Sequence, residues 1–245
     1  MKILVCISHV PDTTTKINFT PDNKTFITQG VQFIINPYDE IALTRALELT
    51  EKSGGTVTVI NVGEAVTEPT IRKALAIGAA DAVRINSLPR EAYFVSMQIA
   101  EYVKKNPFDL ILCGKESIDF NSGTVPSMLA EMLGIPSVAI SKTINIENGK
   151  AIIEREIEGG KEVIECALPV VAGCSESAAE PRIPNMRGIM SARSKPLVVI
   201  EPVQTEEYVR VINYDKPAPR GSVKLVDASD PGKLLELLHT EKKVI

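Results

Sequence analysis

The sequence predicts a doubly wound α/β fold, and three features of the chain lead to this prediction. Short apolar runs alternate with amphipathic stretches from the N-terminus to about residue 135, and the connections between them are short. Three of these runs end close to polar or glycine residues, at Cys6–His9, Val62–Gly63 and Cys113–Gly114. An Asn-Gly turn signal at residues 148–149 then adds an antiparallel hairpin to the parallel sheet.

Charge and hydropathy exclude several broad classes of function. A formal net charge of −4 argues against a general nucleic-acid binder, because such binding depends on cations that neutralise phosphates. No apolar run reaches the roughly 18–20 residues that a membrane-spanning helix needs, so no membrane insertion is expected. The N-terminal apolar run is too short for a signal peptide and is interpreted as a first strand, which predicts a cytoplasmic protein.

The cysteines and histidines form no pattern that indicates a metal or redox centre. The four cysteines lie within or at the ends of apolar runs, without a Cys-x-x-Cys pair or a nearby histidine: Cys6, Cys113, Cys166 and Cys174. Buried, reduced thiols are therefore expected, and no metal site is predicted. Neither His9 nor His239 has a visible catalytic partner.

The first half of the chain supplies the expected strands and helices in alternation. Strands are expected at Lys2–Ser8, Thr56–Val62 and Asp81–Ile85, with helices from Asn36 to Ser53, from Thr67 to Gly78 and from Arg90 to Lys105. Asn36 is expected to be the N-cap of its helix, followed by Pro37 at the first helical position. A small hairpin around Pro21, between Lys16 and Thr28, interrupts the alternation.

The stretch Leu110–Val125 is the strongest candidate for a binding site. Its apolar run ends at Gly114, a polar loop follows, and a helix is expected to open near Ser122 or Thr124 and to continue to Leu133. Unpaired N–H groups and the positive end of the helix dipole would favour a phosphate there. The stretch is neither a P-loop nor a Gly-x-Gly-x-x-Gly sequence, so an ordinary strand-to-helix turn stays open as an alternative.

The second half of the chain changes character after residue 141. Strands are expected at Lys142–Glu147, Ala151–Ile157, Lys161–Leu168 and Leu168–Cys174. Residues 175–196 are interpreted as an exposed loop that enters a short helix with Met186, Ile189 and Met190 among arginines, either a surface connection or a contact site. We therefore expect one domain over residues 1–200 and a C-terminal arm over 201–245, whose final amphipathic helix docks on a partner or back across the body.

Several segments together resemble the β subunit of electron transfer flavoproteins. They follow the order of that family from the first strand to about residue 200: Val5–Asp12, Asn36–Ala42, Thr70–Ala79, Leu112–Asp119, Glu154–Gly160 and Glu180–Met190. The resemblance implies an adenine-nucleotide-binding fold of the HUP-like kind. It also implies a heterodimer with an α subunit that holds most of the redox FAD, while the β subunit buries an AMP and acts as an electron carrier rather than as an enzyme.

The resemblance also assigns residues to the AMP and the flavin. The implied cofactor-binding residues are Cys6, Asn36, Pro37, Tyr38, Asp39, Val62, Gly114, Lys115, Glu116, Ser117, Ile118, Asp119, Phe120, Asn121, Ser122, Gly123, Thr124 and Val125. Tyr38 and Thr13 are implied to lie on the side that faces the flavin.

The resemblance further implies three kinds of protein partner. Glu156 matches a residue thought to pair with an arginine of the α subunit as the flavin domain swings. Residues 180–192 match the recognition loop that docks acyl-CoA dehydrogenases, with Met186 at its apolar anchor and Ile189 and Met190 beside it. Electrons would then pass towards a membrane quinone reductase.

One departure from the family pattern leaves alternatives open. The loop Asn121-Ser-Gly-Thr-Val-Pro stands where many members carry an Asn-Gln-Thr-Gly or Ala-Gln-Val-Gly type of sequence. A β subunit of an electron-bifurcating flavoprotein, with a second FAD reduced by NADH in place of AMP, is the main alternative. An adenine-nucleotide-dependent enzyme would need a phosphate loop, for which Lys115 is the only nearby candidate. A nucleotide-sensing stress module would be shorter and would lack both the antiparallel insert and the Met-Arg loop.

Overall fold

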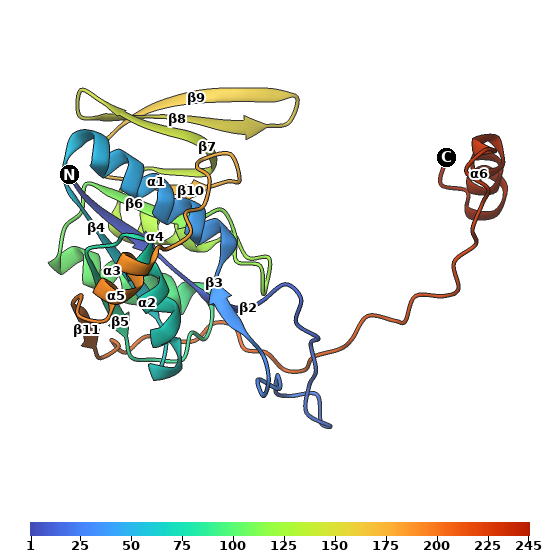
Figure 1. The fold of residues 1–245 in the computed structure, drawn as a ribbon, viewed down its shortest axis with the longest axis horizontal. Helices are drawn as coiled ribbons and strands as arrows, with labels where there is room; N and C mark the ends of the chain where they lie inside the picture. The colour runs from blue at the N-terminus through green and yellow to red at the C-terminus, as the bar shows by residue number, and fades with distance from the viewer.

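The computed structural model describes residues 1–245 and is built on one nine-stranded sheet, in the order β11-β5-β4-β1-β6-β10-β7-β8-β9 (Figure 1). Its strands are β1 (Lys2–Cys6), β4 (Thr56–Val62), β5 (Asp81–Ile85), β6 (Leu110–Gly114), β7 (Ser137–Glu147), β8 (Lys150–Ile157), β9 (Gly160–Ala167), β10 (Val170–Cys174) and β11 (Leu197–Ile200). All neighbouring strands pair in parallel, except that β8 runs antiparallel to both β7 and β9. The predicted α/β fold with an added hairpin is confirmed.

Helices cover both faces of the sheet, as a doubly wound fold requires. The helices of the body are α1 (Pro37–Ser53), the 3₁₀ turn η1 (Ala65–Thr67), α2 (Glu68–Ile77), α3 (Ala92–Lys105), α4 (Val125–Leu133) and α5 (Met186–Ala192). The helix α6 (Pro231–Leu237) and the π turn η2 (Leu238–Lys242) lie at the end of the chain, away from the sheet. Leu43 of α1 and Leu75 of α2 join one buried cluster with Ile3 of β1. Phe94 of α3 and Leu129 of α4 join a second cluster on the opposite face. The central parallel strands β1, β4, β6 and β10 are therefore buried on both sides, which explains their mainly apolar sequences.

The expected small hairpin between Lys16 and Thr28 is confirmed as a turn with an antiparallel bridge, but its two sides are not regular strands. Phe19 and Phe26 form only an isolated bridge, and the segment contains no strand. The antiparallel pair that does form joins β2 (His9–Pro11) and β3 (Phe33–Ile35), one on each side of this excursion. A two-stranded ribbon without a face to bury is marginal in water, whereas β3 packs beside α2 and its Ile35 is fully buried.

The antiparallel part follows the predicted turn chemistry. Asn148 and Gly149 have φ values of 51° and 76°, the pair of positive values that a type I′ turn needs. Ile144 and Ile153 are fully buried in the cluster under α1. The hairpin is thereby part of the main core, and β9 forms one edge of the sheet.

A strand that the sequence analysis did not predict forms the other edge. β11 pairs in parallel with β5, from Leu197 opposite Ala82 to Ile200 opposite Ile85. Val198 and Val199 of this strand remain exposed, so the sequence of β11 shows no clear alternation of buried and exposed residues. Edge strands are less constrained by burial than central ones, which makes them harder to recognise from sequence.

The arm after residue 200 leaves the body in an extended path (Figure 1). The side-chain amide of Gln98 on α3 donates to Val203 O at 2.8 Å and accepts from Val203 N at 2.8 Å. Tyr214 stacks on Phe19 with ring centroids 4.6 Å apart. Beyond Lys216, which donates to Asn18 Oδ1, the chain runs free to α6. The apolar residues of α6 are not buried, so this helix does not fold back across the body.

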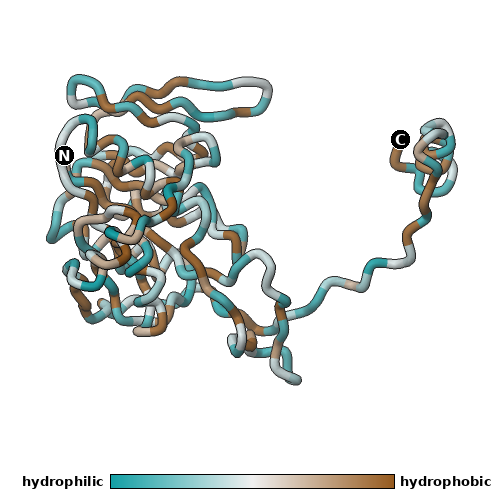
Figure 2. The backbone as a smooth tube through the Cα atoms, viewed as in Figure 1, coloured by the Kyte–Doolittle hydropathy of each residue, from teal (hydrophilic) through white to brown (hydrophobic).

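Hydropathy follows this division of the chain. Apolar segments run through the body, and apolar positions return beside α6 at the far end of the arm (Figure 2). Leu225, Leu234 and Leu235 are all exposed there. No helix combines the length and the apolar character needed to cross a bilayer.

Candidate functional site

The carboxyl ends of β4, β1 and β6 lie side by side at one edge of the sheet. Cys6 ends β1, Val62 ends β4 and Gly114 ends β6. Both Cys6 and Val62 are buried, so they form the floor of this edge rather than its surface. The predicted convergence of three strand ends is confirmed, and ligands of open α/β sheets bind at such edges.

Asp39 joins α1 to two of these strand ends. Its carboxylate accepts hydrogen bonds from Ser8 N at 2.8 Å and from Gly114 N at 2.9 Å. The residue is 4% exposed. Burial raises the pKa of Asp39 to about 7, although the hydrogen bonds it accepts favour the charged form. One buried carboxylate thereby holds the first turn of α1 against β1 and β6.

Gly114 is needed because α1 approaches β6 so closely. A Cβ atom at this position would lie 2.5 Å from Asp39 Oδ1 and 2.6 Å from Tyr38 Cβ. Such distances are shorter than van der Waals contact, so any larger residue would push α1 away from the strand end. The glycine is thus explained by a close backbone approach.

Asn36 occupies the N-cap position but does not cap with its side chain. Its amide nitrogen donates to Glu116 O at 2.8 Å, and its amide oxygen accepts from Ile118 N at 3.3 Å. The Asn36 carbonyl still accepts from Asp39 N, so α1 begins as predicted, followed by Pro37. The predicted N-cap position of Asn36 is confirmed, but its side-chain amide binds the loop after β6 instead of the helix N–H groups.

The loop between β6 and α4 is closed on itself at its base. Ser117 N donates to Ser122 O at 3.0 Å, and the Ser117 hydroxyl donates to the Asp119 carboxylate. Asn121 adopts a left-handed conformation with φ of 50°. A Cβ atom on Gly123 would lie 2.8 Å from Lys115 O, so a glycine fits here. Phe120 projects from this loop with 67% of its surface exposed.

The start of α4 has the features of an anion site. The helix begins at Val125, next to the predicted Ser122–Thr124, and no side chain caps it. The backbone N–H groups of Gly123, Thr124 and Val125 donate to no protein acceptor. Unpaired N–H groups at a helix start, together with the helix dipole, favour a phosphate. The hydroxyls of Ser122 and Thr124 lie 3.1 Å apart beside these groups.

Lys115 is committed to protein partners. Its ammonium lies 2.9 Å from Glu176 Oε1 and 4.7 Å from the centre of the Tyr38 ring. The hydrogen bond with Glu176 raises the pKa of Lys115. Glu176 already balances the positive charge of Lys115. Lys115 therefore differs from the lysine of a phosphate loop, which is free to bind phosphate.

The thiols behave as the sequence predicts. All four cysteines are free, and Cys6, Cys113 and Cys174 are buried, whereas Cys166 is partly exposed. Burial raises the pKa of Cys174 to about 12. The neighbouring Cys6 thiol and burial raise the pKa of Cys113. Protonated thiols of this kind pack as small apolar groups.

Sequence reasoning missed a polar pair next to this edge. Asn61 and Arg84 are directly opposite each other on β4 and β5, and both are buried. Arg84 donates to Gly63 O at 2.9 Å, but Arg84 Nε and Asn61 Oδ1 have no partner. A charged residue within the apolar run Asp81–Ile85 was the available signal. Glu176, the partner of Lys115, was missed because only the fold brings it there.

The residues expected to bind protein partners lie away from this edge. Glu156 is on β8, where it forms an ion pair with Lys142 at 3.2 Å. Met186, Ile189 and Met190 are exposed on α5, and Met186 is 73% exposed. Thr13 lies exposed in the turn after β2. The implied nucleotide contacts therefore gather at the sheet edge, while the implied partner contacts occupy two separate surfaces.

Fold and edge together define an open α/β protein whose parallel strands β4, β1 and β6 end side by side. The family model "Electron transfer flavoprotein domain" matches residues 23–205. The electron transfer flavoprotein subunit beta of Bacillus subtilis is 37% identical over 230 residues, which cover 88% of this chain and 90% of the relative. The chain belongs to the electron transfer flavoprotein family, as a β subunit, and this family is one of electron carriers.

Two further relatives are also similar to this chain. The human electron transfer flavoprotein subunit beta is 32% identical over 240 residues, covering 94% of both chains. Subunit CarD of the caffeyl-CoA reductase–Etf complex of Acetobacterium woodii is 35% identical over 204 residues, covering 81% of this chain and 78% of the relative. A β subunit implies an α subunit, and so a heterodimer.

Proposed function

We propose that this β subunit binds AMP at the edge formed by β4, β1 and β6, as a structural nucleotide. The unpaired N–H groups of Gly123, Thr124 and Val125 carry the proposal, because they offer donors where a phosphate can dock. Asn36 and Asp39 support the site by holding the loop and the first turn of α1 in place. The nucleotide then adds to the stability of the fold by mass action.

The proposed role in electron transfer needs no acid, base or nucleophile from this chain. FAD, held mainly by the α subunit, supplies the redox chemistry when bound. This chain supplies orientation and a dry environment, with Tyr38 and Thr13 on the side that faces the flavin. Glu156 pairs with an arginine of the α subunit, and residues 180–192 dock an acyl-CoA dehydrogenase. Electrons pass from there towards a quinone reductase.

The arm after residue 200 is proposed to bind the α subunit. Leu234 and Leu235 of α6 are exposed, and the helix lies far from the body (Figure 1). An amphipathic helix gains stability mainly when its apolar face is covered, so a partner surface would order it.

Cofactor release from the purified heterodimer tests the nucleotide proposal. Acid treatment followed by mass spectrometry is expected to yield one AMP and one FAD for each heterodimer. A preparation with one FAD and no AMP would contradict the proposal. Two FAD and no AMP would instead support the second candidate, a β subunit of a bifurcating flavoprotein.

The second candidate is favoured by one specific observation. The Acetobacterium woodii relative CarD belongs to a caffeyl-CoA reductase–Etf complex and is as similar as several plain β subunits. In that reading a second FAD, reduced by NADH, takes the place of AMP. Reduction of the purified heterodimer by NADH alone distinguishes the two readings.

Met186 tests the docking role of residues 180–192. Met186→Ala is expected to raise the KM for a reduced acyl-CoA dehydrogenase by about tenfold with unchanged flavin content, because an exposed anchor is shortened. Val163→Ala, an exposed apolar residue on β9, is the matched control. An equal KM for the dehydrogenase in both variants would mean that residues 180–192 are only a surface connection and do not dock the dehydrogenase.

A further inference from the structure

The docking segment, defined as residues 180–192, turns its largest apolar side chains outward. Ile183 is 92% exposed, and Met186 and Met190 are also exposed. α5, which carries the methionines, has only seven residues and is too short to be stable alone. Burial of its own apolar groups therefore cannot hold this segment in one conformation, so other contacts must do so.

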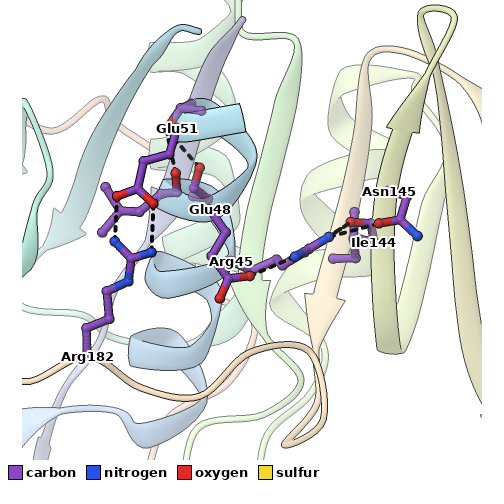
Figure 3. A network of polar contacts seen from close by, with 9 residues as sticks. Arg45, Glu48, Glu51, Ile144, Asn145 and Arg182 are labelled. Atoms are coloured by element: carbon purple, nitrogen blue, oxygen red, sulfur yellow. Dashed lines mark hydrogen bonds and ion pairs between the residues drawn. The ribbon is translucent and has the colours of Figure 1, made fainter. Parts of the chain in front are cut away.

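The first such contact fixes the start of the segment to α1 (Figure 3). Arg182 donates from Nη1 to Glu51 Oε1 at 2.6 Å and from Nη2 to Glu51 Oε2 at 2.8 Å. Arg182 N also donates to Thr44 Oγ1 at 3.3 Å. Parallel bonds from one guanidinium to one carboxylate fix direction as well as distance. The hydrogen bond from Arg182 lowers the pKa of Glu51, so the pair is charged at neutral pH.

The second contact fixes the end of the segment to α2. Arg72 donates from Nη1 to Ala192 O at 2.9 Å and to Lys195 O at 2.8 Å. Lys195 Nζ in turn donates to Leu75 O at 2.9 Å and to Ala79 O at 2.6 Å. Ala192 is buried, and these bonds close the segment at its carboxyl end.

Between the two contacts, α5 lies directly on α2. Any Cβ atom at Gly188 would overlap the backbone carbonyl of Ala76, so glycine permits this close approach. Asn185 caps α5 by accepting from Gly188 N at 2.9 Å. The backbone of the segment is thus held at its start, middle and end, while the side chains that face solvent stay free.

We propose that Glu51 and Arg72 are positioning residues, which hold the docking segment so that Ile183 and Met186 project together as a preformed apolar anchor for the dehydrogenase. The proposal rests on the docking role given to this segment above. An exposed ion pair adds little to folding stability. Ordering the segment before binding removes part of the entropy cost of association. Loss of the ion pair is therefore expected to lower the affinity for the dehydrogenase rather than the folding stability.

The test uses the complete heterodimer and a purified acyl-CoA dehydrogenase reduced by its acyl-CoA substrate. Glu51→Gln is expected to raise the KM for the dehydrogenase about three- to tenfold, with kcat, flavin content and Tm unchanged. Glu48→Gln is the matched control, because Glu48 lies on the same helix but forms its ion pair with Arg45 and no hydrogen bond with Arg182 (Figure 3). The exchanged pair Glu51→Arg with Arg182→Glu is expected to restore most of the loss.

Hydrogen exchange gives a readout that needs no dehydrogenase. Faster exchange is expected at the amides of residues 183–192 in Glu51→Gln and in Arg72→Ala, but not in Glu48→Gln. Unchanged exchange and unchanged KM in Glu51→Gln would overturn the proposal. If Met186→Ala raises the KM while Glu51→Gln does not, only the positioning role fails. If neither variant changes the KM while exchange still quickens, the docking role fails and the positioning of the segment stands.

Discussion

Asp39 shows how one residue can decide the geometry of the edge. It accepts backbone hydrogen bonds from the ends of β1 and β6 while sitting in the first turn of α1. A shorter or apolar side chain would leave Ser8 N and Gly114 N unpaired in a buried place, which is costly. An acid in the first turn of a helix is common in sequence, but the contacts of Asp39 with two strand ends appear only in the folded chain.

The pKa of Asp39 predicts an unusual dependence of stability on pH. The pKa of Asp39 in the folded protein, about 7, lies above the ordinary aspartate pKa of 3.8. Between the two values the folded protein keeps a proton that the unfolded chain loses, so the stabilising contribution is complete below about pH 4 and is lost as the pH rises to about 7. The slope is on the order of 1 kcal/mol per pH unit at most.

Asp39→Asn is expected to remove this slope. The amide cannot accept from both Ser8 N and Gly114 N, so a loss of about 1–3 kcal/mol at pH 5 is also expected. Urea unfolding at several pH values between 4 and 8 measures both effects. Asp12→Asn serves as the control, because the hydrogen bond from the Thr14 hydroxyl lowers the pKa of Asp12, so that Asp12 stays charged over this pH range. If Asp39→Asn kept the wild-type dependence of stability on pH, a group other than Asp39 would be responsible for that dependence.

At the scale of elements, α3 anchors the beginning of the arm. The Gln98 side-chain amide forms hydrogen bonds with both the N–H and the C=O of Val203, as the backbone of a neighbouring strand would. Glu91 accepts from Tyr208 N at 2.9 Å, and Tyr93 meets the Tyr208 ring edge-on at 4.8 Å. The arm is therefore guided along α3 before it leaves the body.

Gln98→Ala is expected to loosen the first part of the arm. Loss of two hydrogen bonds, each contributing about 0.5–1.5 kcal/mol, should speed tryptic cleavage after the exposed Arg210 by about tenfold. Gln204→Ala is the control, because the Gln204 side chain lies in the arm itself and makes no hydrogen bond in the protein. Equal cleavage rates in the two variants would show that the arm does not depend on Gln98.

At the scale of the whole molecule, the body and the end of the arm are independent in this chain. The last contacts with the body are the Tyr214 stacking on Phe19 and the bond from Lys216 Nζ to Asn18 Oδ1 at 2.7 Å. Lys224 pairs with Glu241, so the final segment is closed only on itself. A stable body and an exposed apolar helix at the far end fit a chain that completes its packing on another subunit.

Removal of residues 217–245 tests this division. The body should keep its melting temperature within about 2 °C, because no body contact is lost. Association with the α subunit is expected to weaken at least about tenfold, since the apolar face of α6 is gone. Titration calorimetry with the α subunit measures this change, and Leu234→Glu with Leu235→Glu in the full chain separates helix contact from arm length. Undiminished affinity in both would place the α-subunit contact elsewhere.

Local pattern was sufficient for much of the fold and for part of the site. Strands at Thr56–Val62 and Asp81–Ile85 were predicted with their observed bounds, because their β-branched and apolar residues favour strands. The Asn148–Gly149 turn was predicted from the conformations that only certain residues adopt easily. The meeting of Cys6, Val62 and Gly114 followed from alternation alone, because parallel strands end on the same side of a sheet.

The sequence by itself therefore determined the architecture, the edge where a ligand can bind and, through its resemblance, the family. Only the tertiary structure decided what holds that edge and the docking segment: the reach of Asn36 to Glu116, Asp39 between two strands, and Arg182 on Glu51. It also decided that β11 joins the sheet and that the Lys16–Thr28 segment does not form a hairpin of strands. The periodicity of a sequence indicates burial and local conformational propensity. These contacts join residues tens to more than a hundred positions apart, so no local pattern predicts them.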